Sequence, residues 1–79
     1  MIKVLFFGPI ADRMQTREMQ LEFVHGMTLH EVIAQLGAQH PSAFGLVSFI
    51  AVNQTQIHDK HTVLNDNDEI AFMAKFSGG

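Results

Sequence analysis

The sequence has 79 residues, no cysteine, a formal net charge of −3 and only five Lys and Arg residues. A chain of this length forms one domain, and without disulfides its stability must come from packing of its apolar residues, which make up 47% of the total. The scarcity of basic residues argues against nucleic-acid binding, and the opening apolar run is too short for a signal peptide or a membrane span. We therefore expect a cytoplasmic protein that binds neither nucleic acid nor membranes.

The first third of the chain predicts a pair of strands with a long connection. Ile2–Phe7 is rich in β-branched and aromatic residues, and Gly8-Pro9 interrupts it. Glu18–Val24 then resumes an alternating apolar pattern, which is typical of a half-buried strand. The connection contains a small group of charged residues that we interpret as a solvated loop: Asp12, Arg13 and Arg17.

The next segment is the clearest helix in the sequence. Thr28 and Glu31 have the spacing of a capping box, in which each side chain accepts a hydrogen bond from the backbone of the other. Gly37 and Pro41 bracket the expected end of this helix, since glycine and proline are common at and beyond a helix C-terminus. The apolar residues that follow the spacing of one helix face are Leu29, Val32, Ile33 and Leu36.

Three further strands are expected in the second half of the chain, at Ser48–Val52, Gln56–His58 and Glu69–Lys75. Asn53-Gln54 and Asn65–Asp68 are predicted to be turns, and Asn67 is the residue best suited to a left-handed backbone. One main helix with this many strands in so short a chain predicts an α+β fold, a mixed sheet with the helix across one face.

The sheet face away from the helix is expected to be unusually apolar. Side chains alternate along a strand, so if Lys3 points to solvent, Leu5 and Phe7 point with it. Contiguous apolar groups of this kind usually mark a partner site. The alternative is that the loop Pro41–Gly45, or Phe76, covers part of this face. With the two later strands included, the predicted open-face patch consists of Leu5, Phe7, Phe49 and Met73.

The sequence ends in Phe76-Ser77-Gly78-Gly79. Glycine has no Cβ, so a diglycine can pass through a slot too narrow for any side chain. Four extended residues reach about 13 Å, at about 3.3 Å each, which would place the Gly79 α-carboxylate clear of the domain. We therefore divide the chain into a domain, residues 1–76, and a flexible tail, residues 77–79, that offers this carboxylate to a partner. The alternative is an idle, frayed terminus.

The remaining polar residues predict no metal site. The five histidines are scattered, and although His58 and His61 are close in sequence, they lack a third nearby ligand for zinc. Asn65–Glu69 lacks the glycine and the glutamate that a calcium loop requires. Its Asn and Asp side chains are instead typical of a turn.

A family resemblance rests on five stretches of the sequence: Met1–Phe7, Thr28-Leu29, Ala51–Thr55, Leu64–Phe72 and Gly78-Gly79. In their order and spacing these stretches resemble the MoaD/ThiS family of ubiquitin-like sulfur carriers, and within it the MoaD small subunits of molybdopterin synthase. The resemblance spans essentially the whole chain and implies a β-grasp fold. Two departures are Asn67, where the family commonly has glycine, and Ala74-Lys75, where prolines commonly stiffen the approach to the tail.

The resemblance also implies a mechanism in which the protein is not an enzyme by itself and binds no cofactor. An ATP-dependent activating partner would adenylate the Gly79 carboxylate, and a sulfur donor protein would convert the adenylate to a thiocarboxylate. The large subunit of molybdopterin synthase, in a heterotetramer, would use this sulfur to build the dithiolene of molybdopterin. Gly78 would give clearance, Ser77 and Phe76 would position the tail, and the open-face patch would dock the domain.

Three alternatives stay open at this point. A ThiS-like carrier for thiazole synthesis would share the fold, the tail and the activation, and would differ in the final sulfur acceptor. A ubiquitin-like protein modifier would join Gly79 to a lysine of a target protein. A binding module would use the domain alone and leave the tail idle.

Overall fold

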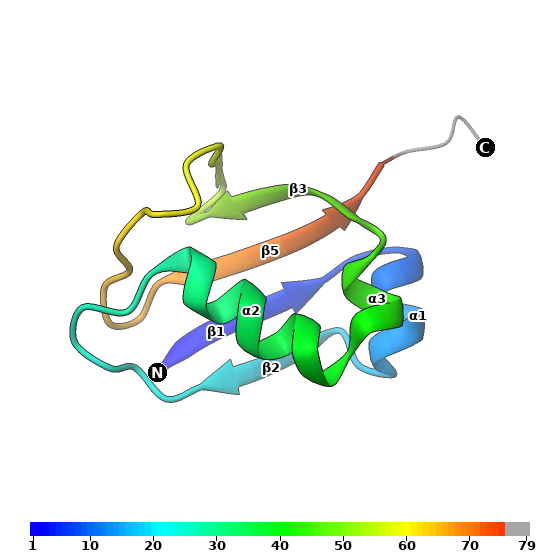
Figure 1. The fold of residues 1–79 in the computed structure, drawn as a ribbon, viewed down its shortest axis with the longest axis horizontal. Coiled ribbons are helices and arrows are strands. Elements are labelled where there is room, and N and C mark those ends of the chain that lie inside the picture. The colour runs from blue at the N-terminus through cyan, green and yellow to red at the C-terminus, as the bar shows by residue number, and fades with distance from the viewer. Residues whose placement is uncertain (76–79) are drawn as a thin grey trace.

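The computed structural model describes residues 1–75, and the segments rich in β-branched and aromatic residues form a five-stranded mixed sheet (Figure 1). The elements in chain order are β1 (Ile2–Phe6), α1 (Pro9–Met14), β2 (Glu18–Leu21), α2 (Leu29–Gln39), α3 (Pro41–Phe44), β3 (Val47–Val52), β4 (Thr55–Gln56) and β5 (Glu69–Ala74). Within residues 1–75, no helix has the length and apolar character needed to cross a membrane.

The first and last strands lie side by side in the sheet, whose order is β2-β1-β5-β3-β4. The β1–β5 pair is parallel, and the other pairs are antiparallel. Along β1 the side chains of Ile2, Val4 and Phe6 are buried against the helices, whereas Lys3 and Leu5 point the other way. The α2 and α3 helices lie across one face of the sheet (Figure 1), so the predicted α+β class is confirmed.

The predicted main helix and its buried face are confirmed in α2. The Thr28 Oγ1 accepts a hydrogen bond from the Glu31 N–H at 3.3 Å, and the Thr28 N–H donates to Glu31 Oε1 at 3.2 Å, which completes the capping box. Leu29, Val32 and Leu36 have no exposed surface, and the fourth residue of the predicted face, Ile33, packs half-buried against them.

The predicted end of this helix, between Gly37 and Pro41, is confirmed, because α2 ends at Gln39. Pro41 prevents its continuation, since a residue before proline avoids the helical region, and His40 has φ −135° and ψ 62°. A Cβ built at Gly37 would lie 3.7 Å from the Cβ of Phe44 in α3, an ordinary van der Waals distance.

The connection between the first two strands is a helix, α1, and not the solvated loop that we predicted. Pro9 occupies its first turn, where the missing N–H costs nothing. Ile10 is fully buried in the core, which holds the short helix in place. Gln15 ends α1 in a left-handed conformation, with φ 60°. The charged residues Asp12 and Arg13 lie exposed on this helix.

The segment that was an alternative cover for the open face instead forms α3 on the opposite side of the sheet. Ala43 is fully buried in the core under the helices, and the Phe44 ring contacts the rings of Phe6 and Phe72 at centroid distances of 6.4 Å and 4.9 Å. The loop Pro41–Gly45 therefore does not cover the open-face patch.

The boundaries of all five strands differ from prediction. β1 ends at Phe6 and not at Phe7, and β5 ends at Ala74 and not at Lys75. The second strand ends at Leu21 instead of Val24. The strand expected at Ser48–Val52 begins at Val47, and only its second half is buried. The short return is Thr55–Gln56, because the tight Asn53-Gln54 turn pairs Thr55 directly with Val52.

The two predicted turns are confirmed, and a hydrogen-bond network joins them. Asn53 and Gln54 both have positive φ, as a tight hairpin turn requires, and Asn67 has φ 72°. The Asn53 Nδ2 donates to Asp68 Oδ1 at 2.9 Å, and the Glu69 N–H donates to Asn53 Oδ1 at 3.0 Å. This network fastens the β3–β4 hairpin to the start of β5.

We expect Asp68→Ala to lower the free energy of unfolding by about 1.5 to 3 kcal/mol, the range for losing hydrogen bonds to a charged group. Asp68 is 8% exposed, and its second oxygen accepts from the Asn65 N–H at 2.7 Å, so alanine would leave two donors unpaired. Urea denaturation measures the change. Asp68→Asn, which retains one acceptor, should lose less; equal losses for both variants would contradict this account.

The Asp66 carboxylate lies in the same turn and accepts a hydrogen bond from the N-terminal ammonium group of Met1 at 2.6 Å. That hydrogen bond, together with the positive charge of the ammonium group, holds the pKa of Asp66 below its ordinary value. The interaction lies in the turn before β5, at the opposite end of that strand from the C-terminal segment. It therefore stabilises the turn.

Candidate functional site

The four residues of the predicted open-face patch lie together on the helix-free face of the sheet. Leu5 of β1 pairs in register with Ala71 of β5, and Phe49 of β3 pairs with Met73 of β5. Phe7 continues the outward side of β1, and its N–H donates to the carbonyl of Phe72 at 3.3 Å. The alternation of side chains and the strand order therefore place all four on one surface, as predicted.

Within the open-face patch, the two aromatic residues are the most accessible. Phe7 is 48% exposed and Phe49 is 41% exposed, while Leu5 and Met73 are half-buried between them. Large aromatic side chains rarely stay this accessible in a monomer unless they contact a partner. The surface has the composition of a protein interface core, with aromatic and Met side chains and no charged group among the four.

The open-face patch adjoins the point at which the chain leaves the sheet. Strand β5 ends at Ala74, directly after Met73, and Lys75 is the last described residue. The predicted tail residues Phe76, Ser77, Gly78 and Gly79 lie outside the described residues. A partner bound to the patch would thus contact the base of the C-terminal segment.

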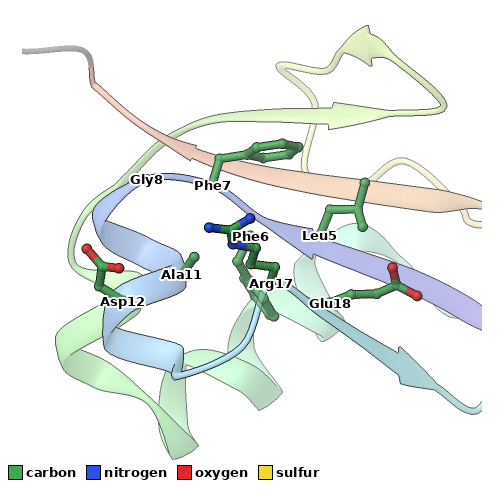
Figure 2. A pocket seen from close by; sticks show the side chains of 8 residues that line it. All are labelled: Leu5, Phe6, Phe7, Gly8, Ala11, Asp12, Arg17 and Glu18. Atoms are coloured by element: carbon green, nitrogen blue, oxygen red, sulfur yellow. The ribbon is translucent and has the colours of Figure 1, made fainter.

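Beside the open-face patch is a pocket of about 430 Å³, where β1 ends, α1 begins and β2 starts (Figure 2). Gly8 has φ 56°, a conformation that side chains disfavour, and a Cβ built there would meet nothing within 4 Å, so the pocket wall is open at this point. This pocket was not expected from the sequence, because the connection between the first two strands was interpreted as a loop; the Gly8-Pro9 pair was the available signal. The lining residues are Leu5, Phe6, Phe7, Gly8, Ala11, Asp12, Arg17 and Glu18.

No group of three or more potential His, Cys, Asp or Glu metal ligands is found in residues 1–75. In the structure, the ring neighbour of His61 is a histidine from another part of the sequence. The ring of His61 lies beside that of His30, with a centroid distance of 5.8 Å. The backbone brings them together, because the His30 N–H donates to the Lys60 carbonyl at 2.7 Å.

The fold agrees with a comparison against known families. A family model described as the ThiS family matches residues 4–79. The chain belongs to the ThiS family. This confirms the MoaD/ThiS membership that the sequence motifs indicated.

Relatives of this ThiS family chain include the molybdopterin synthase sulfur carrier subunit of Chlamydomonas reinhardtii, which is 32% identical over 82 residues covering 99% of this chain and 98% of that protein. A similar solved structure is the complex of subunits 1 and 2 of molybdopterin-converting factor from Helicobacter pylori, with TM-score 0.71 and 29% identity over 99% of this chain and 97% of the matched one. Small archaeal modifier protein 1 from Methanosarcina acetivorans has TM-score 0.79 at 22% identity, over 99% and 95% of the two chains. These likenesses confirm the ubiquitin-like β-grasp fold.

The motifs that support the ThiS family resemblance have two different roles in the structure. Asn53 and Asp68 form or join the turns at one end of the sheet, so their identities are explained by folding. Leu5 and Phe7, in contrast, are apolar residues that the fold leaves accessible near the other end of β1. Among these described residues, Leu5 and Phe7 are therefore the ones that folding does not explain.

Proposed function

We propose that this protein is the sulfur carrier subunit of a molybdopterin synthase and that it acts through a thiocarboxylate on Gly79. The observation that carries the proposal is the 32% identity to the molybdopterin synthase sulfur carrier subunit of Chlamydomonas reinhardtii over 99% of this chain. The similar Helicobacter pylori structure is a complex of subunits 1 and 2, which supports a large-subunit partner for this chain. The open-face patch is the surface that we assign to that partner.

The proposed chemistry begins with a carboxylate, which is a poor acyl electrophile. An ATP-dependent activating enzyme joins the Gly79 carboxylate to AMP and releases pyrophosphate, so that AMP becomes the leaving group. The terminal sulfur of a protein persulfide attacks the acyl carbon and displaces AMP. A thiol then cleaves the resulting S–S bond, which leaves the thiocarboxylate on Gly79 and oxidises the thiols to a disulfide. Covalent carriage of this kind divides one difficult transfer into easier steps.

In this proposal the chain supplies position and its partners supply catalysis. The domain docks through the open-face patch, and Phe76 and Ser77 lead the Gly78-Gly79 end into the partner's active site, where Gly78 gives clearance. The large subunit, in a heterotetramer, uses the sulfur to form the dithiolene of molybdopterin. The carrier is not an enzyme by itself, binds no cofactor, and works in the cytoplasm, where the activating enzyme has ATP.

Intact-mass spectrometry of the untagged protein, purified from cells with its partners, tests this function. The carrier proposal expects a fraction of the chain in which one oxygen is replaced by sulfur, and transfer of that sulfur to a pterin precursor when the purified large subunit is added. Sulfur transfer only to a thiazole precursor would instead establish the ThiS-like alternative. Higher-mass conjugates through target lysines would establish a protein modifier, and an unmodified chain under sulfur-loading conditions would overturn the proposal.

We expect Phe7→Ser to weaken binding to the large subunit by about 2 kcal/mol or more, the loss typical of an aromatic residue at the centre of an interface. The fold should persist, because Phe7 is 48% exposed and lies outside the buried core. Titration calorimetry measures the affinity, and a thermal melt checks the fold. Val63→Ser is the matched control, since Val63 is 59% exposed but lies outside the open-face patch. Equal affinity of Phe7→Ser and wild type would remove Phe7 from the interface.

A further inference from the structure

The pocket beside the open-face patch has a cation without a partner in the described part of the chain. In Figure 2 the Arg17 side chain points into the hollow below Phe7, while the carboxylates of Asp12 and Glu18 lie to either side of it. Within residues 1–75 the guanidinium group of Arg17 forms no salt bridge and no hydrogen bond. Its donors are therefore free to bind an acceptor from another molecule.

The backbone holds Arg17 at this place although its side chain is unpaired. The Arg17 carbonyl accepts a hydrogen bond from the Phe6 N–H at 2.9 Å, which ties it to the end of β1. The Thr16 Oγ1 donates to the Glu18 carbonyl at 2.9 Å and so fixes the turn that leads into β2. Because the backbone is already positioned, a partner must order only the side chain of Arg17 on binding.

The charges of the pocket restrict the acceptor that it can take. Asp12 and Glu18 line the same pocket as Arg17, so a multiply charged group such as a phosphate or a polyanion would be repelled more strongly than a single carboxylate. A single carboxylate can still bind the guanidinium with two parallel hydrogen bonds. The adjacent apolar wall, Leu5 and Phe7, belongs to the open-face patch, so the same partner would reach both surfaces.

We propose that this pocket receives an Asp or Glu side chain of the large synthase subunit, paired with Arg17, and that an apolar neighbour of that residue packs against Leu5 and Phe7. This inference rests on the proposed function. It assigns Arg17 a role in partner specificity, because a partner without the carboxylate would leave the guanidinium buried in the interface and unpaired.

Calorimetric affinity for the purified large subunit from the same genome tests the inference. Arg17→Gln should weaken binding by about 10-fold or more, the equivalent of losing a hydrogen bond between charged groups. Arg17→Lys should restore part of the loss, since it keeps the charge but not the planar fork. Arg17→Glu should weaken binding most, and its deficit should shrink at high salt. Arg13→Gln and Arg13→Glu are matched controls, because Arg13 is exposed on α1 but does not line the pocket.

The outcomes separate this inference from the proposed function. If Phe7→Ser weakens binding while Arg17→Gln and Arg17→Glu bind like wild type, the proposed carboxylate partner of Arg17 is wrong. The assignment of the open-face patch as the docking surface is then retained. If the Arg13 and Arg17 variants lose affinity equally, the effect is one of overall charge, and the pocket proposal is overturned. Absence of any binding between the wild-type chain and the large subunit would overturn the proposed function itself. Thermal melts of all variants exclude loss of folding as the cause.

Discussion

Appending one alanine after Gly79 is expected to abolish sulfur loading while leaving the melting temperature almost unchanged. The proposed reacting atom is the Gly79 carboxyl carbon, and one additional residue displaces the carboxylate by about 3.3 Å. A displacement of about 1 Å in an active site can already cost about 100-fold in rate. The buried core of the described residues lies within residues 2–72, and the extension is added outside it. Intact-mass spectrometry after incubation with the activating enzyme, ATP and a sulfur donor measures the loading.

Gly78→Val provides a second test of the same end of the chain. It retains the position of the terminal carboxylate but adds a branched side chain where we expect a narrow slot, so it should also fail to load. Ser77→Ala is the matched control, because it changes a neighbouring side chain without adding bulk. If the alanine-extended protein loads as well as wild type without being trimmed, the tail is not the reacting group and the domain functions as a binding module.

Leu36→Ala is expected to reduce the free energy of unfolding by about 2 to 5 kcal/mol, as for other large-to-small changes in a core. Leu36 has no exposed surface and belongs to the α2 face that packs on the sheet. Small domains have total stabilities of about 5 to 15 kcal/mol, so the variant should be unfolded in part at moderate temperature. Urea denaturation at constant temperature measures the difference.

The control for Leu36→Ala is Gln35→Ala on the same helix. Gln35 is exposed, and alanine has the higher helix propensity, so its stability should differ from wild type by about 0.5 kcal/mol or less. A stability of Leu36→Ala equal to that of wild type would contradict the packing of α2 on the sheet. A variant that is fully unfolded should regain structure when the large subunit is added in excess, since ligands of the native state stabilise it.

Features with local causes could be predicted from the sequence alone. The capping box of Thr28 and Glu31 starts α2 because both partners lie within one helical turn. Asn67 takes a left-handed conformation because its own side chain tolerates it. The alternation of side chains similarly placed Leu5 and Phe7 on the open face, whatever the neighbouring strands were.

The tertiary structure decided the features whose stabilising contacts come from distant residues. The α1 and α3 helices have six and four residues, which is too short for a stable helix in isolation, and each forms because it buries a residue in the common core: Ile10 and Ala43. The sequence placed the end of α2 between Gly37 and Pro41, and only the structure shows that it falls at Gln39. In the sequence, Arg17 is interpreted as a charged residue of a solvated loop. The pocket that it enters forms only where the end of β1, the start of α1 and the start of β2 meet in the fold.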